Sequence, residues 1–208
     1  MPILAENKGS NYKVVDAGVY PARCYSMIEL GTQTSEFNGE VKVSRQVNIT
    51  WELPTETAVF HEENGEQPYS VSKNYNLSMH EKSTLRKDLE SWRGNGFTEE
   101  EAKVFDITKL LGKECQISII HKTSNDGLKT YANIGTITPV MKGITVPVQI
   151  NPTRVLCFDN FDFNVFKELP EWLKEKITQS PEFQAIQGYN ETMQEQSNQE
   201  PDNQGLPF

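Results

Sequence analysis

Cysteine and histidine are scarce in this sequence, and neither is arranged to bind a metal or to form a disulfide framework. The three cysteines, Cys24, Cys115 and Cys157, are far apart and include no Cys-x-x-Cys pair, which argues against a disulfide framework and against a zinc site. The three histidines show no His-x-x-x-His spacing. We therefore expect no metal, no cofactor and a reducing compartment such as the cytoplasm.

The sequence also lacks catalytic motifs and long apolar runs. It contains no GxxxxGK[ST] phosphate loop, no GxSxG nucleophile turn and no paired acidic metal motif, so we expect a protein that is not an enzyme. No window approaches the roughly 18 uninterrupted apolar residues that a membrane span requires, and the first residues contain no long apolar run. We expect a cytoplasmic chain that makes no membrane contact.

Excess positive charge is absent too, because the formal net charge is −9. Proteins that bind nucleic acids usually neutralise phosphates with Lys and Arg. The acid is unevenly spread: residues 151–208 contain four Lys and Arg and ten Asp and Glu, which leaves sixteen and nineteen for residues 1–150. A nearly balanced first part can present a basic groove on one face. The charge thus weakens a nucleic-acid-binding hypothesis without eliminating it.

Apolar residues recur at every second position in several segments, which is typical of strands. Asn38-Gly39 predicts a type I′ hairpin turn between the first two strands. Arg45 breaks an otherwise regular alternation and indicates a bulge, and the acidic residues 55–68 predict a loop. The predicted strands are residues 19–30, 41–53, 69–77, 113–122 and 129–140.

Two small helical pieces are expected between the third and fourth strands. Ser78 and Glu81 form a capping-box pattern ahead of apolar residues at helical spacing, and Thr98 and Glu101 repeat that pattern. Five strands with a helix between the third and fourth form the arrangement of an oligonucleotide/oligosaccharide-binding (OB) barrel. We predict a mainly β fold with such a barrel in residues 1–150. A split sheet with a flanking helix is the alternative.

The remainder of the chain predicts an extension and a tail. Residues 151–188 are rich in aromatics and Pro, and a short amphipathic helix is expected from Glu171 to about Thr178, with Pro170 at its first turn. We expect this extension to pack on the barrel. Residues 189–208 are acidic and almost devoid of apolar side chains, so we predict a disordered acidic tail.

Rings and cations are interleaved along the predicted strands. A protein that binds single strands needs flat rings on which bases stack and cations that follow the phosphates, and each stacked base contributes about 1–3 kcal/mol. Strand aromatics are more often core, which we expect for Trp51 and Trp92, whereas Tyr75 and Tyr131 fit either role. The candidate DNA-binding residues are Arg23, Tyr25, Lys42, Arg45, Lys73, Tyr75, Lys122, Lys129 and Tyr131.

Three segments carry a resemblance to a known family: VSKNYNLSMHEKSTLRKDLESWRGNGFT (71–98), FDITKLLGKECQISIIHK (105–122) and YANIGTITPVMKG (131–143). They resemble tailed-phage proteins described as single-stranded DNA-binding proteins, and LPEWLKEKITQSPEF (169–183) is similar to the closing helix of that family. The resemblance implies the OB barrel and single-stranded DNA as the ligand. The resemblance does not show which residues contact the DNA.

The last residues carry a second similarity. An acidic residue, Asp202, followed by Leu206, Pro207 and Phe208 is similar to the tail tip of bacterial single-stranded DNA-binding proteins, which docks on partner enzymes. Phe208 would fill an apolar pocket, and its α-carboxylate would meet an Arg or Lys of the partner. The tip departs from the pattern in having few acids and Gly205 before Leu206, so a fortuitous ending is the alternative.

Together these observations predict a sequence-tolerant single-stranded DNA-binding protein of phage DNA replication or recombination. It would coat exposed single strands in the host cytoplasm and recruit replication or recombination enzymes through its tail. A non-catalytic phage interaction module that uses the same barrel is the rival hypothesis, and a nuclease subunit is a third. The sequence leaves a homo-oligomer open.

Overall fold

The computed structural model describes residues 14–37, 39–124 and 126–187. They fall into two compact units. The first unit contains the described residues up to Tyr25 together with Thr50–Lys73 and Lys87–Thr153, and the second contains Ser26–Ile49, Asn74–Arg86 and the described residues from Arg154 onwards. The predicted tail, with Asp202, Leu206, Pro207 and Phe208, lies outside the described residues.

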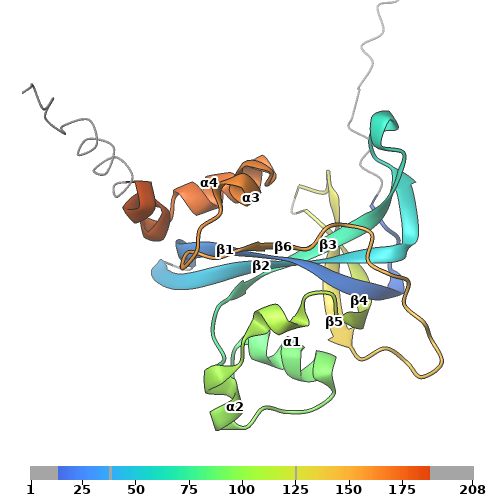
Figure 1. Cartoon of the computed structure of the whole chain (residues 1–208), viewed down its shortest axis with the longest axis horizontal. Coiled ribbons are helices and arrows are strands. Elements are labelled where there is room, and N and C mark those ends of the chain that lie inside the picture. Colours follow the sequence, from blue (N-terminus) through green and yellow to red (C-terminus); the bar gives the residue numbers. More distant parts are fainter. Residues whose placement is uncertain (1–13, 38, 125, 188–208) are drawn as a thin grey trace, which may run out of the picture. The chain divides into compact units, whose positions relative to one another are not determined.

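The strands form one six-stranded sheet, in which the order is β3-β2-β1-β4-β5 and β6 pairs with β1 beside this path. A mainly β fold with small helices between β3 and β4 is therefore confirmed (Figure 1). The sheet is open, with β3 and β5 at its two ends, so the described residues do not show the closure of a barrel. The strands are β1 (Gly18–Phe37), β2 (Glu40–Val59), β3 (Glu66–Asn76), β4 (Glu114–Thr123), β5 (Thr130–Thr138) and β6 (Arg154–Leu156).

The hairpin predicted at Asn38-Gly39 is confirmed, because β1 ends at Phe37 and β2 begins at Glu40. Gly39 has a φ of 78°, and a type I′ turn requires positive φ at its central residues. The long loop expected over residues 55–68 is wrong. β2 continues to Val59, and only a 3-10 turn at Glu62–Asn64 separates it from the start of β3.

The apolar positions of β2 are buried only in the middle of the strand, and there Asn48 and Glu52 on the predicted polar face are buried too. Val47, Ile49 and Trp51 are buried as expected, but Val41 and Val43 are 65% and 63% exposed. A two-residue period predicts one buried face only where a layer covers that face. The strand forms as predicted, but among the described residues no layer covers its apolar face at Val41 and Val43.

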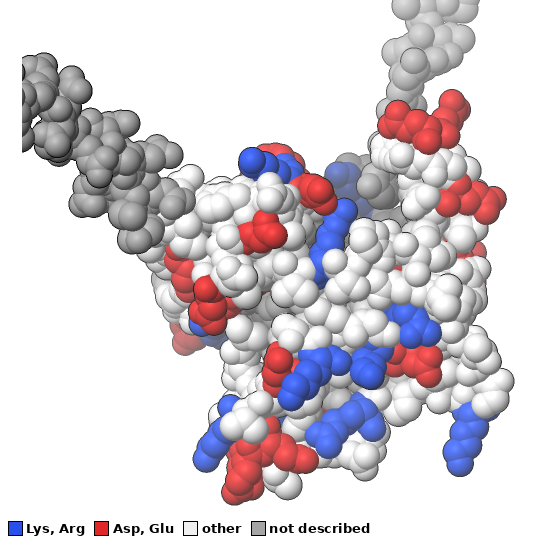
Figure 2. Space-filling model, in the orientation of Figure 1, with Lys and Arg blue, Asp and Glu red and all other residues white. Residues whose placement is uncertain are grey.

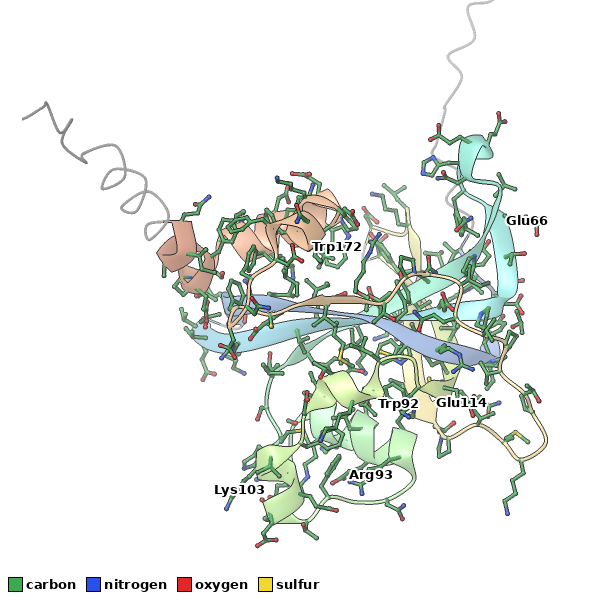
Figure 3. All side chains as sticks on the ribbon, in the orientation of Figure 1. Glu66, Trp92, Arg93, Lys103, Glu114 and Trp172 are labelled. Carbon is green, nitrogen blue, oxygen red and sulfur yellow. The ribbon has the colours of Figure 1, made fainter. Side chains whose placement is uncertain are left out.

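Helix α1 (Thr84–Arg93) packs on the first unit through its second half. Trp92 Nε1 donates to the carbonyl of Glu114 at 2.9 Å, and Ser91 Oγ donates to the carbonyl of Ile137 at 2.6 Å, so α1 is bonded to β4 and β5 (Figure 3). The rings of Trp51 and Trp92 lie 5.8 Å apart, and both are buried. The prediction that the two tryptophans belong to the core is confirmed.

One predicted helix start is wrong and the other is confirmed. Residues 78–83 are coil with a turn at 81–82, and Ser83 Oγ, not that of Ser78, accepts from the backbone N–H of Arg86 at 3.1 Å. Helix α2 (Glu99–Val104) begins with the predicted capping box, in which Thr98 and Glu101 each accept from the other's backbone N–H. Within the described ranges, no helix is both long enough and apolar enough to cross a membrane.

A buried carboxylate holds the coil that follows β5. Glu52 is expected on the outer face of its strand, but it is fully buried in the first unit. Its two oxygens accept from the backbone N–H groups of Ile150 and Asn151 at 2.7 and 2.8 Å, and Asn151 Nδ2 donates a third bond of 2.7 Å. A buried charge requires such donors, so Glu52 and this coil stabilise each other.

The second unit has its own apolar core between β1, β6 and the C-terminal helices. The amphipathic helix expected at Glu171–Thr178 is confirmed as α4. Helix α3 (Phe163–Lys167) and β6 are not predicted, because their sequences are short and lack a periodic pattern (Figure 1). The buried members of this core are Ile28, Leu30, Leu156, Leu169, Leu173, Ile177 and Phe183.

Glu182 fixes β1 to the C-terminal part of the chain within the second unit. It accepts from the backbone N–H of Thr32 at 2.8 Å and from the Thr32 hydroxyl at 2.6 Å. Burial raises the pKa of the Glu182 carboxyl, but the two bonds from Thr32 together lower it further, and the net result is a pKa below its ordinary value of 4.5. The ionised carboxylate is thus part of the folded structure.

Replacing Glu52 by Ala leaves the N–H groups of Ile150 and Asn151 without their acceptor. We expect the free energy of unfolding to fall by about 2–4 kcal/mol, measured by urea unfolding followed by tryptophan fluorescence. The control is Glu100→Ala, an exposed carboxylate on α2, which should change stability by less than about 0.5 kcal/mol. Equal effects of the two variants would contradict the role of Glu52.

The Glu182→Gln variant should show a pH-dependent loss of stability. Because the folded-state pKa is lowered, the carboxylate stabilises the fold above pH 4.5 and loses this effect as the pH falls through the lowered pKa. The melting temperature should therefore drop relative to the unchanged protein at pH 7, and the difference should shrink at pH 3. The exposed Glu175→Gln provides the control. An equal difference at both pH values would be inconsistent with this linkage.

Candidate nucleic-acid interface

A groove of about 1020 Å³ opens in the first unit between β3 and β5. β3 lines it with Pro68–Ser72, the turn before β5 with Leu128 and Lys129, and β5 with Thr130–Ala132. Val14, Val15 and Phe60 complete the wall. We call this feature the β3–β5 groove.

The groove follows from the open sheet. β3 and β5 are the two ends of the strand order, so among the described residues the edges that would meet in a closed barrel leave a space. His121 Nε2 lies 2.8 Å from the carbonyl of Val15 and fixes the chain at the rim of this space. His121 therefore has a structural partner in the wall of the groove.

Three aromatic rings line the groove. Phe60 and Tyr69 pack edge to face, with ring centroids 5.1 Å apart. Tyr131 is 51% exposed and pairs across the strands with Lys122, which is also exposed. Cross-strand partners lie on one face of a sheet, so this ring and this ammonium group share a surface.

Several of the candidate residues meet at this groove. Lys129 and Tyr131 line it, and Lys122 is the cross-strand neighbour of Tyr131. Tyr25 reaches its edge, because the hydroxyl of Tyr25 donates to Ser70 Oγ at 3.2 Å. These four residues come from three strands and one turn, and the fold brings them together.

Three other candidates serve the structure instead. Tyr75 is only 3% exposed, so it cannot stack on a base, and its assignment as a contact residue is wrong. Arg23 donates to the carbonyls of Gly112, Val146 and Pro147 at 2.8–3.1 Å and holds these loops. Lys73 forms an ion pair with Asp88 at 2.6 Å. Their cationic or aromatic character is used within the fold.

The last two candidates belong to the second unit. Arg45 forms an ion pair with Glu29, whose other oxygen accepts from the backbone N–H of Phe158 at 3.0 Å. This hydrogen bond with Glu29 raises the pKa of Arg45 above its ordinary value. Lys42 is exposed near the end of the β1–β2 hairpin. Neither residue is a member of the groove.

Sequence reasoning missed Phe60 and Tyr69. Both lie in or beside residues 55–68, where the acidic composition indicates a loop. Phe60 directly follows the last residue of β2, and no local pattern could reveal the ring pair, because Phe60 and Tyr69 meet only when β2 and β3 form a hairpin. Pairing of strands therefore created this part of the site.

The charge on the face drawn in Figure 2 is mixed. Acidic side chains gather at the end of the β2–β3 hairpin, where Glu62 and Glu63 lie, and basic and acidic side chains are interspersed over α1 and α2. In the part of the chain that the structure describes, no group of three or more His, Cys, Asp or Glu could hold a metal ion. Burial raises the pKa of Cys115 well above its ordinary value, so this thiol is a poor nucleophile. The arrangement is suited to binding a ligand with flat apolar faces.

Replacing Tyr75 or Tyr131 by Ala should distinguish a core ring from an exposed ring on which a base can stack. We expect Tyr75→Ala to lower the free energy of unfolding by about 3–5 kcal/mol, because it empties a buried site. Tyr131→Ala should change stability by less than about 1 kcal/mol, because half of that side chain is already in water. Thermal melting of the two variants beside the unchanged protein gives the answer. A large loss at Tyr131 would place that ring in the core.

Comparisons with known proteins identify no relative: no family model, no curated protein and no solved structure matches this chain. The resemblance of residues 71–98, 105–122 and 131–143 to tailed-phage proteins therefore stays a prediction.

Proposed function

We propose that this protein binds single-stranded DNA through the β3–β5 groove, without catalysis, in phage DNA replication or recombination. The observation that carries the proposal is the set of three rings, Phe60, Tyr69 and Tyr131, on the wall of one groove. Unpaired bases expose flat faces that stack on such rings, whereas a duplex hides them. The groove would thus select single strands and tolerate any sequence.

The strand order supports an OB-type barrel. The order β3-β2-β1-β4-β5 is that of a five-stranded barrel opened between its third and fifth strands. OB barrels bind oligonucleotides with the face of strands 2 and 3 and with the loop between strands 4 and 5. Here β3 and the turn that carries Leu128 and Lys129 form two walls of the groove. This likeness supports the proposal that the β3–β5 groove is the DNA-binding surface.

The cations predict a weak salt dependence. Lys129 and Lys122 are the candidate cations at the groove, since Arg23 and Lys73 bind groups of their own fold. Binding to a single strand changes log K by about −0.7 per neutralised phosphate for each unit of log salt concentration. Two contacts correspond to a slope of about −1.4. Stacking would then supply most of the affinity.

We also propose a role for the C-terminal tail. Asp202, Leu206, Pro207 and Phe208 would recruit replication or recombination enzymes, by filling an apolar pocket with Phe208 and meeting cations with the acids. This role needs no contribution from the groove.

A labelled oligo-dT and the matching duplex test the proposal by fluorescence anisotropy. We expect the single strand to bind far more tightly than the duplex, and Tyr131→Ala to weaken it about 5- to 150-fold, the equivalent of one stacked base. Trp172→Ala is the matched control, because Trp172 is a ring of similar exposure, 44% against 51% for Tyr131, on α4 in the other unit (Figure 3). Equal affinity for single strand and duplex, or equal effects of the two variants, would refute the proposal.

The rival is a protein-interaction module that uses the same groove. It is favoured by the apolar character of the wall, to which Val14, Val71 and Leu128 contribute. An extended peptide with apolar side chains could lie there by adding a strand to the edge of β3 or β5. The anisotropy experiment decides between the two, because a peptide groove predicts no binding of oligo-dT.

A further inference from the structure

The end of the β1–β2 hairpin has an edge that no third strand covers. β1 and β2 are 20 residues long, whereas β3 has 11 residues and ends beside Arg45, whose carbonyl accepts from the N–H of Leu77 at 2.7 Å. Within the described residues, no strand lies next to β2 between Gly39 and Val43 on the β3 side. We call this stretch, residues 39–43, the free edge.

Some backbone N–H and carbonyl groups of the free edge point away from β1, where they can pair with another strand. Carbonyl and N–H groups of a strand point to alternate sides at successive residues. Because the carbonyl of Arg45 faces β3, those of Val43 and Val41 face the same side, away from β1. The Lys42 carbonyl faces the other way, toward β1, where it accepts from the Ser35 hydroxyl at 3.5 Å.

The side chains of the free edge are apolar on one face and charged on the other. Val41 and Val43 are more than half exposed and lie two residues apart, which puts them on one face of the strand. Glu40 and Lys42 alternate with them on the opposite face. An exposed apolar strand edge is a template for another strand.

We infer that two copies of this chain pair antiparallel through their free edges, with Val41 of one copy opposite Val41 of the other. In this register Glu40 lies opposite Lys42 of the second copy, and Lys42 opposite its Glu40. Sliding one strand by two residues also keeps the outward-facing N–H and carbonyl groups opposite each other. That register places Lys42 opposite Lys42, which is unfavourable. Charge complementarity therefore selects the pairing about Val41.

Lys42 can make this contact beside those it has in its own chain. It takes part in an interaction within the fold, and an ammonium group has three N–H donors. On the other face, Val43 of each copy lies beside Gly39 of its neighbour, so the four valines form one apolar cluster. Both faces of the pairing are thus complementary.

The free edge has the length that this pairing needs. The strand of the second copy reaches its turn at its own Gly39, which lies opposite Val43, two residues before Arg45, where β3 begins to pair. The second copy therefore continues the line of β3 without displacing it. The joined hairpins form a four-stranded sheet.

The pairing is two-fold symmetric and closes with two copies. Each copy uses the same surface, so the assembly is a dimer and not a filament. Five residues on each side form a contact far smaller than the roughly 1,600 Å² of a stable interface, which predicts a weak dimer in free solution. Adjacent binding on one DNA strand would raise the effective concentration.

Sedimentation velocity on the full chain without DNA, from about 5 to 500 μM, tests the dimer. We expect a reversible monomer–dimer equilibrium, and a dissociation constant about tenfold higher for Glu40→Lys and for Lys42→Glu, because each turns two attractive pairs into repulsive ones. The double variant Glu40→Lys with Lys42→Glu should restore the original constant within about twofold. Rescue by the double variant is the specific signature of this register.

The control is Lys103→Glu, which makes the same charge change at an exposed residue of α2 and should leave the dissociation constant unchanged. Purely monomeric sedimentation at every concentration, assembly beyond two copies, or single variants without effect would overturn the inference. The experiment contains no DNA, so a failure of the proposed DNA binding would leave its result intact.

Discussion

The backbone hydrogen bonding of β1 is the constraint on which the rest of the structure depends. One edge of this strand pairs with β2, and the other pairs first with β4 along Gly18–Arg23 and then with β6 along Ser26–Ile28. The N–H and carbonyl groups of a buried strand need hydrogen-bond partners. β4 pairs only with the first part of β1, so β6 supplies the partners for the part that follows. The C-terminal extension is thus part of the sheet through β6.

Where strand pairing stops, the candidate binding surfaces begin. β3 and β5 end the sheet, and the groove with Tyr69 and Tyr131 lies between them. β2 extends beyond the end of β3, and this leaves the edge at Val41 and Val43 for another copy. Both proposals therefore use strand edges that the described residues leave uncovered.

Charged side chains inside the fold explain why composition is a poor guide to the surface. Glu52 and Glu29 are buried and accept backbone N–H groups, and Arg23 is committed to backbone carbonyls. Such charges count in the net charge of −9, but their hydrogen bonds lie within the fold, so they are not available to contact a phosphate. The cations of the groove, Lys122 and Lys129, matter more than the total.

Local features of the fold could be predicted from the sequence alone. The turn at Asn38-Gly39, the capping box of Thr98 and Glu101, and α4 each depend on residues within a few positions of one another. Their hydrogen bonds and backbone angles are set by neighbours in the chain. The burial of Trp51 and Trp92 was predictable for a similar reason, since large rings on a periodic apolar face are usually covered.

Only the tertiary structure decided the roles of individual residues in the candidate site. Tyr75 and Tyr131 both lie on strands, yet one is sealed and the other exposed, because burial depends on segments distant in the sequence that cover one face and leave another open. The same holds for the buried Glu52 and for the meeting of Phe60 with Tyr69. The sequence by itself determined a β-rich chain, the hairpin turn after β1, the capping box of Thr98 and Glu101, and helix α4. Which faces of its strands were covered, and which edges stayed open, depended on contacts between residues far apart in the chain, and no local pattern records those contacts.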